Sequence, residues 1–351
     1  MVPVVDLSRR GARFAGAFAE VAERIARRGS YLLGEQLEAF ERELATWLDA
    51  GHAAGVASGA SALQLALTAA GVGTGDDVLV PAFTAVPTAS AVVAAGATPV
   101  AVDVDPVTAC LTPAAIEHAT TPRTRAAIVV HLYGYPAELP PPGDLIVIED
   151  AAQAMGALGP LDRSRAAAYS FYPTKNLGGI GDGGAVVTND AALDASVRLL
   201  RTHGLSGEYV HEAVSQNFRM SEIEAAWLRL GLATVAGDVD ARRAIAARYR
   251  AAAPQLCWQH HDPRHAYHLC VFRTQQRDAV RERLASHGVA TAVHYPRALT
   301  QQPAYRAMFP DACPQAEAWA AECVSVPCFP ELTDDEIERV AGALAQLPAR
   351  A

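Results

Sequence analysis

The chain has 351 residues, 51% hydrophobic and 19% charged, a composition typical of a globular protein with a large core and about two domains. Its 38 acidic residues outnumber 29 basic ones, and the resulting net charge of −9 argues against nucleic acid as a partner. Residues 1–10 lack the apolar segment of a signal peptide, and no apolar run is long enough for a membrane span. The six cysteines form no C-x-x-C pair, which favours reduced thiols and a cytoplasmic location.

Helices and strands alternate in the first half of the chain. Apolar periodicity predicts helices over 8–28, 35–48, from about 60, 84–95 and 113–119, and strands over 77–80, 98–103 and 126–131. This alternation is typical of a parallel sheet with helices on its faces. Residues 136–143, P-A-E-L-P-P-P-G, leave almost no room for a helix before the next strand, so we expect an unusually short, Pro-rich crossover there.

Strands over 145–149, 167–172 and 185–188 continue the sheet, followed by helices over 191–203 and from the N-cap Ser221 to about 235. We expect Gly237 and Asp238 to break the chain. Helix 239–252 then leads into a smaller α/β unit, with strands over 267–272 and 289–293 and helices over 276–287, 315–323 and 333–346, the last capped by Thr333. The predicted domains are 1–236 and 237–351.

Polar side chains follow two neighbouring strands of this sheet. Asp150 ends the buried strand 145–149, at the edge where open α/β sheets place ligands, and Gln153 follows three residues later. Ser170 lies on strand 167–172, and Lys175 follows it on a turn before a glycine-rich segment. An ordinary interpretation is a solvated lysine and an aspartate that caps a helix. The four residues together favour a binding site instead.

Lys175 has apolar neighbours in Phe171, Tyr172 and Leu177. Desolvation favours the neutral amine, which is a nucleophile that condenses with aldehydes. In enzymes that use pyridoxal phosphate (PLP), an aspartate that faces the pyridinium nitrogen accompanies such a lysine. The pair of Asp150 and Lys175 therefore predicts PLP chemistry.

The segment V-A-S-G-A-S-A-L contains a second candidate site. Ser58 and Gly59 lead into a strongly helical run, and the free amides at a helix start attract anions. With Ser61 as a hydroxyl donor, this start could hold a phosphate. The alternative is an ordinary serine N-cap.

Two other patterns carry less weight. The glycines between 178 and 184 follow a turn and open a strand, whereas a dinucleotide loop follows a strand and opens a helix. A thiol-imidazole cluster has ligand types suited to zinc but a spacing that matches no known finger or ribbon, so we expect no metal site. His265 and His268 are interpreted as loop and interface residues. The cluster comprises Cys257, His260, His261, His265, His268 and Cys270.

From about Asp6 to Ala345 the chain resembles the DegT/DnrJ/StrS family of PLP-dependent sugar aminotransferases. The matching segments include Y-L-L-G-E-Q-L-E-A-F-E, G-V-A-S-G-A-S-A-L, A-G-A-T-P-V-A-V-D-V-D-P, H-L-Y-G-Y-P-A, I-E-D-A-A-Q-A, S-F-Y-P-T-K-N-L-G, G-D-G-G-A-V-V-T-N-D, N-F-R-M-S-E-I-E-A-A, H-Y-P and S-V-P-C-F-P. The resemblance implies a fold type I, aspartate-aminotransferase-like homodimer with shared active sites. It also implies a mainly parallel seven-stranded sheet and a smaller C-terminal α/β domain.

The resemblance also implies roles for individual residues. Lys175 would form the Schiff base with PLP, Asp150 would pair with the ring nitrogen and Gln153 would lie against the ring oxygen. Family members with histidine at the lysine position catalyse dehydration, so Lys175 favours transamination. The residues expected at the phosphate are Ser170, Gly59, Ala60 and, from the partner subunit, Asn217.

Two positions depart from the family pattern. Ala60 replaces the usual threonine, so one hydroxyl for the phosphate is lost and Ser61 is the candidate substitute. Ala85 replaces the aromatic residue that stacks on the PLP ring, and Phe83 is the nearest aromatic. Weaker retention of PLP is the expected consequence.

We therefore expect an aminotransferase that moves an amino group from glutamate or glutamine to a keto-sugar nucleotide. Alternatives are a keto-cyclitol acceptor, a different PLP reaction such as dehydration or epimerisation, and a non-catalytic regulator. Candidates for substrate contacts are Tyr31, Arg219, His294 and Tyr295, each equally plausible as a structural residue.

Overall fold

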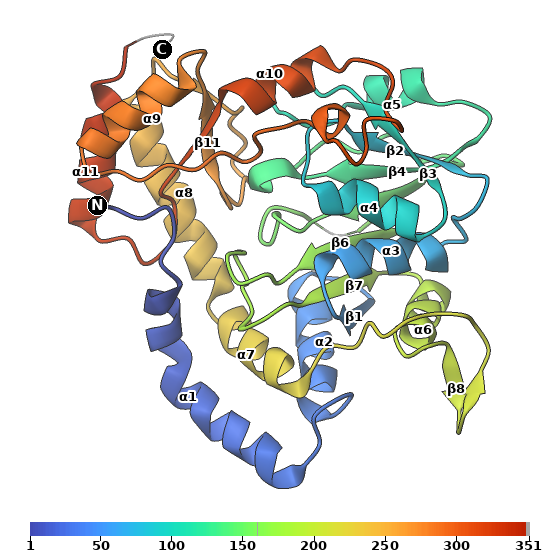
Figure 1. The fold of residues 1–351 in the computed structure, drawn as a ribbon. Coiled ribbons are helices and arrows are strands. Elements are labelled where there is room, and N and C mark those ends of the chain that lie inside the picture. Colours follow the sequence, from blue (N-terminus) through green and yellow to red (C-terminus); the bar gives the residue numbers. More distant parts are fainter. Residues whose placement is uncertain (160, 349–351) are drawn as a thin grey trace.

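A seven-stranded sheet forms the centre of the computed structural model, which describes residues 1–159 and 161–348 (Figure 1). The strand order is β1-β7-β6-β5-β4-β2-β3, and all neighbours are parallel except β7, which runs antiparallel to β1 and β6. The prediction of a mainly parallel sheet is confirmed. The strands are β1 (His52–Val56), β2 (Asp77–Pro81), β3 (Thr98–Val102), β4 (Thr124–Val130), β5 (Ile146–Asp150), β6 (Ala166–Ser170) and β7 (Gly184–Thr188).

Helices cover both faces of this sheet, so its strands are apolar throughout. On β6, Ala166 and Ala168 belong to the core under α3 (Gly59–Ala69), α4 (Val86–Ala94) and α6 (Ala191–Leu200). The alternate residues Ala167 and Tyr169 belong to the core under α2 (Glu35–Trp47) and α7 (Glu222–Leu232). This division follows from the two-residue side-chain period of a strand. α5 (Pro113–Ala119) follows β3, and the short 3-10 helix η1 (Leu132–Gly134) precedes the predicted Pro-rich crossover to β5.

The long helix α1 (Leu7–Arg28) lies apart from the sheet and packs on α7 (Figure 1). Asp6 caps its first turn, and Gly29 ends it with a positive φ of 69°, a conformation that glycine adopts without strain. Phe14 and Phe18 meet Trp227 of α7 edge-on, at ring-centroid distances of 5.6 and 5.1 Å. The predicted N-terminal helix is thus confirmed.

The predicted chain break at Gly237 and Asp238 is wrong. Helix α8 (Val235–Ala252) continues through both residues, and the turn from α7 lies earlier, at Ala233 and Thr234. Glycine weakens a helix by only about 1 kcal/mol, and here the buried Val235 and Val239 anchor the first turn. The domain boundary between 236 and 237 stays a prediction.

A smaller antiparallel sheet of three strands follows α8, in the order β10 (Cys257–Trp258), β11 (Cys270–Arg273) and β12 (Cys323–Val326). The predicted strand 289–293 is wrong, because Val289 and Ala292 make only isolated bridges, to Val2 and Ser325. β12 was missed, since the apolar run after α10 continues the helical pattern without a break. The remaining elements are α9 (Arg277–Ser286), the 3-10 helix η2 (Leu299–Gln301), α10 (Pro314–Glu322) and α11 (Asp334–Ala345).

A two-stranded hairpin, β8 (Leu205–Gly207) with β9 (Val210–His211), projects from the body at the lower right of Figure 1. Tyr209 at its tip is 89% exposed. Within residues 1–159 and 161–348, no helix has both the length and the apolar character that crossing a membrane requires.

Candidate active site

Asp150 ends β5 with its carboxylate buried. Oδ2 accepts a hydrogen bond from Thr88 Oγ1 at 2.8 Å, and Oδ1 accepts one from the Ala152 amide at 3.2 Å. Burial raises the pKa of this carboxyl, while the bond from Thr88 and the nearby charge of Lys175 oppose the rise. A buried acid held by two neutral donors is suited to face a cationic group.

Lys175 lies on the turn that follows β6, as predicted, and it is the only lysine among the 351 residues. Its amine makes no hydrogen bond or ion pair with any side chain or main-chain atom in the described part of the chain. Burial lowers its pKa to about 8, although the carboxylate of Asp150 acts in the opposite direction. A substantial fraction of this amine is therefore neutral, and nucleophilic, near physiological pH.

Helix α7 holds the glycine-rich segment behind the lysine. Trp227 Nε1 donates to the carbonyl of Gly178 at 3.0 Å, and the Gly181 amide donates to Glu224 Oε2 at 2.9 Å. A Cβ at Gly179 would lie 1.6 Å from Glu224 Oε1, so only glycine allows this approach. The segment is thus fixed by side chains from an element that follows it by about forty residues in sequence.

Gln153 joins η1 to the H-Y-P turn. Its Oε1 accepts from the Tyr133 amide at 2.5 Å, and its Nε2 donates to the Tyr295 hydroxyl at 2.9 Å. Burial raises the pKa of Tyr295 to about 12 and lowers that of His294 to about 4, and the charge of Lys175 adds to the second shift. The two substrate candidates of the H-Y-P turn are therefore brought to the lysine.

The start of α3 meets the end of β6. Ser58 caps the helix, with its Oγ accepting from the Ser61 amide at 3.1 Å and lying 2.9 Å from Ser61 Oγ. A Cβ at Gly59 would lie 2.6 Å from the Cβ of Ser170. Gly59, Ala60 and Ser61 are only partly buried there. The predicted anion site thus consists of free amides, a helix N-terminus and serine hydroxyls.

The other predicted contacts lie elsewhere. Tyr31 is 55% exposed, and its carbonyl accepts from the Glu222 amide. Arg219 Nε donates to Asn217 Oδ1 at 2.9 Å, on an extended segment beside the end of β1. Asn217 is exposed, so its assignment to a partner's site stays a prediction. Phe83 is fully buried, stacks on Trp319 at 6.0 Å and meets Tyr295 only at its edge.

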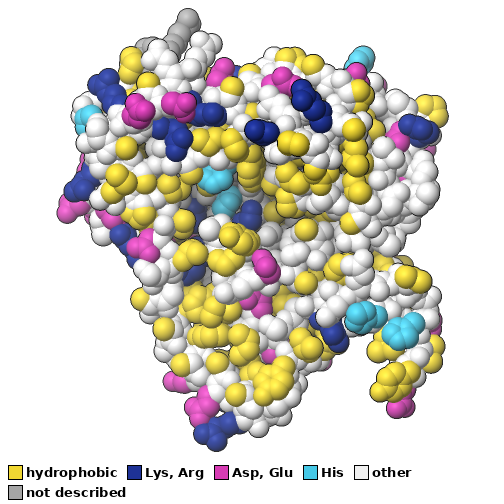
Figure 2. Space-filling model, viewed as in Figure 1, with side chains coloured by type: hydrophobic (Ala, Val, Ile, Leu, Met, Phe, Trp, Pro, Cys, Tyr) yellow, Lys and Arg dark blue, Asp and Glu magenta, His cyan; other side chains and the backbone are white. Residues whose placement is uncertain are grey.

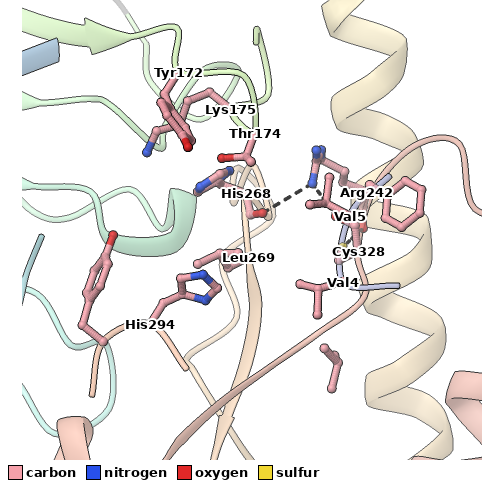
Figure 3. Close-up of a pocket in the computed structure, with 13 residues that line it drawn as sticks. Val4, Val5, Tyr172, Thr174, Lys175, Arg242, His268, Leu269, His294 and Cys328 are labelled. Atoms are coloured by element: carbon pink, nitrogen blue, oxygen red, sulfur yellow. Dashed lines mark hydrogen bonds between the residues drawn. The ribbon is translucent and has the colours of Figure 1, made fainter. Parts of the chain in front are cut away.

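A cavity of about 310 Å³ opens beside Lys175 and is lined by two residues that the sequence did not assign to the active site (Figure 3). They are Arg242 of α8 and His268, which was interpreted as an interface residue. Figure 2 shows histidine and basic side chains in a hollow at the centre of this face. The flanking Tyr267 and Leu269 are the signal that could have placed His268 in a buried turn. Arg242 has no comparable signal, because an arginine on an amphipathic helix usually faces solvent.

The thiol-imidazole cluster is dispersed. His265 stacks on Tyr267 at 3.9 Å between ring centroids, and its Nε2 lies 3.0 Å from Gln259 Oε1. Residues 1–159 and 161–348 contain no group of three or more His, Cys, Asp or Glu that could hold a metal ion.

The arrangement fits a phosphorylated aldehyde with a ring nitrogen. The neutral amine of Lys175 suits the aldehyde, and the buried carboxylate of Asp150 suits a protonated ring nitrogen. The partly buried helix start at Gly59, with its free amides and the Ser170 side chain beside it, suits the phosphate.

Comparison with known proteins gives the same result. The model of the DegT/DnrJ/EryC1/StrS aminotransferase family matches residues 14–345. The dTDP-3-amino-3,4,6-trideoxy-alpha-D-glucose transaminase of Streptomyces venezuelae is 41% identical over 99% of this chain and 97% of its own. The erythromycin biosynthesis sensory transduction protein EryC1 of Saccharopolyspora erythraea is 40% identical over 98% of both chains.

The fold agrees as well. The crystal structure of DesV from S. venezuelae, in complex with a ketimine intermediate, superimposes with a TM-score of 0.93 at 38% identity, covering 98% of each chain. The smaller sheet and the mainly parallel sheet are thus those of the PLP-dependent aminotransferases. The chain belongs to the DegT/DnrJ/EryC1/StrS aminotransferase family, and it is a PLP-dependent aminotransferase.

Proposed function

We propose that this enzyme moves an amino group from glutamate or glutamine to the ketone carbon of a nucleotide-linked sugar. The observation that carries the proposal is a buried Asp150 close enough to act on the charge of the low-pKa amine of Lys175. The sugar is proposed because the S. venezuelae relative is named for a dTDP-linked amino sugar.

When bound, PLP supplies an aldehyde that carries the amino group and a ring that withdraws electrons from the reacting carbon. Lys175 would hold the aldehyde carbon and, once displaced by a substrate amine, move a proton between the substrate carbon and the cofactor carbon. Asp150 would keep a proton on the ring nitrogen, and Gln153 would hold the ring oxygen. The amides of Gly59 and Ala60, with the Ser61 and Ser170 hydroxyls, would bind the phosphate.

His294 and Tyr295 are proposed to contact the substrates, because both lie against Lys175 or Gln153. At a pKa of about 4, His294 is a neutral imidazole at physiological pH, so it donates or accepts a hydrogen bond without adding charge. Tyr295 keeps its proton and donates one hydrogen bond at most.

We further propose a homodimer in which Asn217, Arg219 and Tyr31 complete the partner's site. All three are on the surface of the single chain, although their main chain is well anchored. The exposed hairpin tip at Tyr209 and the fully exposed Val214 support a partner on this side. A cytoplasmic location is proposed from the six cysteines, all of which are free thiols.

The test is a panel of ketosugar nucleotides and keto-cyclitols, scored by conversion of the pyridoxamine form and by transfer of ¹⁵N from labelled donor. Stoichiometric transfer to a ketosugar nucleotide supports the proposal. Transfer only to a keto-cyclitol, or a product without donor nitrogen, contradicts it. Because Lys175 is the only lysine, borohydride reduction should attach the cofactor to one side chain, and Lys175→Ala should abolish the attachment.

A further inference from the structure

The cavity beside Lys175 is lined by basic and apolar groups and by no carboxylate. Its lining includes Lys175, Arg242, His268 and His294, and none of its lining residues is Asp or Glu. The N-terminal residues Val4 and Val5 close one side. Both imidazoles are neutral, but the charged Arg242 and the partly protonated Lys175 leave the lining net positive, which favours an anionic occupant.

Arg242 is the buried cation of this cavity, with a side chain only 2% exposed. Its Nη1 donates to the main-chain carbonyls of Tyr267, at 3.3 Å, His268, at 3.4 Å, and Cys328. Its Nε is buried without a partner, and the guanidinium makes no ion pair within the described part of the chain. Burial accordingly lowers the pKa of Arg242 to about 10. Nη2 also makes no hydrogen bond to any described residue and, unlike Nε, is not fully buried, so it can receive a carboxylate oxygen.

His268 provides a second group without a partner. The side chain is 7% exposed, and its buried Nδ1 has no hydrogen bond within the described residues. Burial, with the charges of Lys175 and Arg242, holds its pKa well below the usual value, so the ring is neutral. Figure 3 shows the imidazole between Lys175 on one side and Arg242 on the other. A ligand that extends from the lysine towards Arg242 must therefore pass His268.

We infer that this cavity is the subsite for the amino donor, and that Arg242 and His268 bind the side-chain carboxylate of a dicarboxylic amino acid such as glutamate. The inference rests on the proposed transamination. The reacting carbon of the donor would lie at Lys175, and His268 lies between Lys175 and Arg242, so we assign the remote carboxylate to Arg242. A volume of about 310 Å³ has room for a five-carbon amino acid.

The subsite discriminates against glutamine. An amide presents an NH₂ group where Arg242 offers only donors, so it forms fewer hydrogen bonds with the guanidinium than a carboxylate does. An amide also leaves the buried guanidinium without a counter-charge. Charge-assisted hydrogen bonds are about twice as strong as neutral ones, so we expect a preference of about 10- to 100-fold for the carboxylate.

The test uses glutarate and its monoamide, glutaramate, as unreactive probes of the PLP-loaded enzyme, with binding measured by calorimetry. Glutarate should bind the wild-type enzyme at least about tenfold more tightly than glutaramate. Arg242→Gln should remove the preference. Arg248→Gln, on the same helix but in an exposed pair with Glu338, should retain it.

Equal affinities of the wild-type enzyme for the two probes overturn the inference without any variant, so a poorly folding Arg242→Gln does not leave it undecided. A preference that survives in a folded Arg242→Gln also overturns it. The proposed acceptor is tested separately, by adding ketosugar nucleotides to enzyme preloaded with pyridoxamine phosphate. Failure of that reaction with an intact glutarate preference contradicts the acceptor alone.

Discussion

Arg10 of the N-terminal helix donates a hydrogen bond to the main-chain carbonyl of Lys175, with Nη1 at 3.0 Å from the oxygen. The same nitrogen donates to the carbonyl of Pro173 at 3.1 Å. Arg10 is 6% exposed, and burial lowers its pKa. A Cβ at Gly178 would lie 2.2 Å from this nitrogen, so glycine allows the guanidinium to enter the turn. The far N-terminus of the chain thereby fixes the backbone of the reactive lysine.

Replacement of Arg10 by methionine should therefore disturb the position of Lys175 and lower its reactivity. It removes no group that is expected to touch cofactor or substrate. Two buried carbonyls would lose their donor, at about 1–3 kcal/mol each if no water enters. We expect PLP affinity and kcat to fall by about 10- to 100-fold, and the pH midpoint of cofactor attachment to change. Spectrophotometric titration with PLP across pH measures the affinity and the midpoint, and a steady-state rate assay measures kcat.

Arg27→Met is the matched control, because Arg27 lies on the same helix in an exposed pair with Glu23. Such pairs contribute about 0–1 kcal/mol, so PLP binding should be unchanged. An Arg10→Met enzyme with wild-type affinity and pH profile would show that the turn holds its shape without the guanidinium.

The sequence predicted most of the large sheet. It also predicted Asp150, Gln153, Ser170 and Lys175 at one site, because each lies within a few residues of a strand end. β1 was missed, since H-A-A-G-V contains too few β-branched residues to differ from a helix or loop. Arg242 and Arg10 could not be predicted, because each reaches the site from a helix distant in sequence. Phe83 is adjacent to the expected stacking position, but its side chain is buried against Trp319.

The amine of Lys175 should titrate at a pH well below that of an ordinary lysine side chain. Its pKa of about 8 means that the protonated, unreactive form prevails below pH 8 and the neutral nucleophile above it. The rate at which the apo-enzyme captures PLP should rise through pH 8 and level off by about pH 9. With an ordinary lysine, the rate of capture would continue to rise up to about pH 10.4. Stopped-flow absorbance across this range measures the midpoint.

Asp150→Asn provides the control for this titration. The negative charge of Asp150 favours the ammonium form, so its removal should move the midpoint to lower pH. A midpoint near 10 in the wild-type enzyme, or an upward shift in the variant, would contradict the electrostatic account.

Gly59→Ala should weaken binding of the cofactor phosphate. The added Cβ would lie 2.6 Å from the Cβ of Ser170, which forces apart the helix start and the strand end. We expect the Kd for PLP and for inorganic phosphate to rise by about tenfold or more, with pyridoxal, which has no phosphate, much less affected. Gly16→Ala, where nothing lies within 4 Å of the new Cβ, should leave all three affinities unchanged. An equal loss for pyridoxal would indicate general misfolding rather than a damaged anion site.

Ala85→Phe should strengthen PLP retention. Ala85 is the N-cap of α4, and three residues later the hydroxyl of Thr88 donates to Asp150. Because Asp150 is expected to pair with the ring nitrogen of PLP, an aromatic ring at position 85 would begin close to the PLP ring. Stacking of an aromatic side chain on a flat ring contributes about 1–3 kcal/mol, which corresponds to a Kd about 5- to 150-fold lower. Equilibrium dialysis of PLP measures the change. Val93→Phe, on the exposed face of the same helix, is the control and should have no effect. If both variants bind PLP like the wild type, Ala85 does not face the ring, and retention depends on the phosphate and the lysine alone.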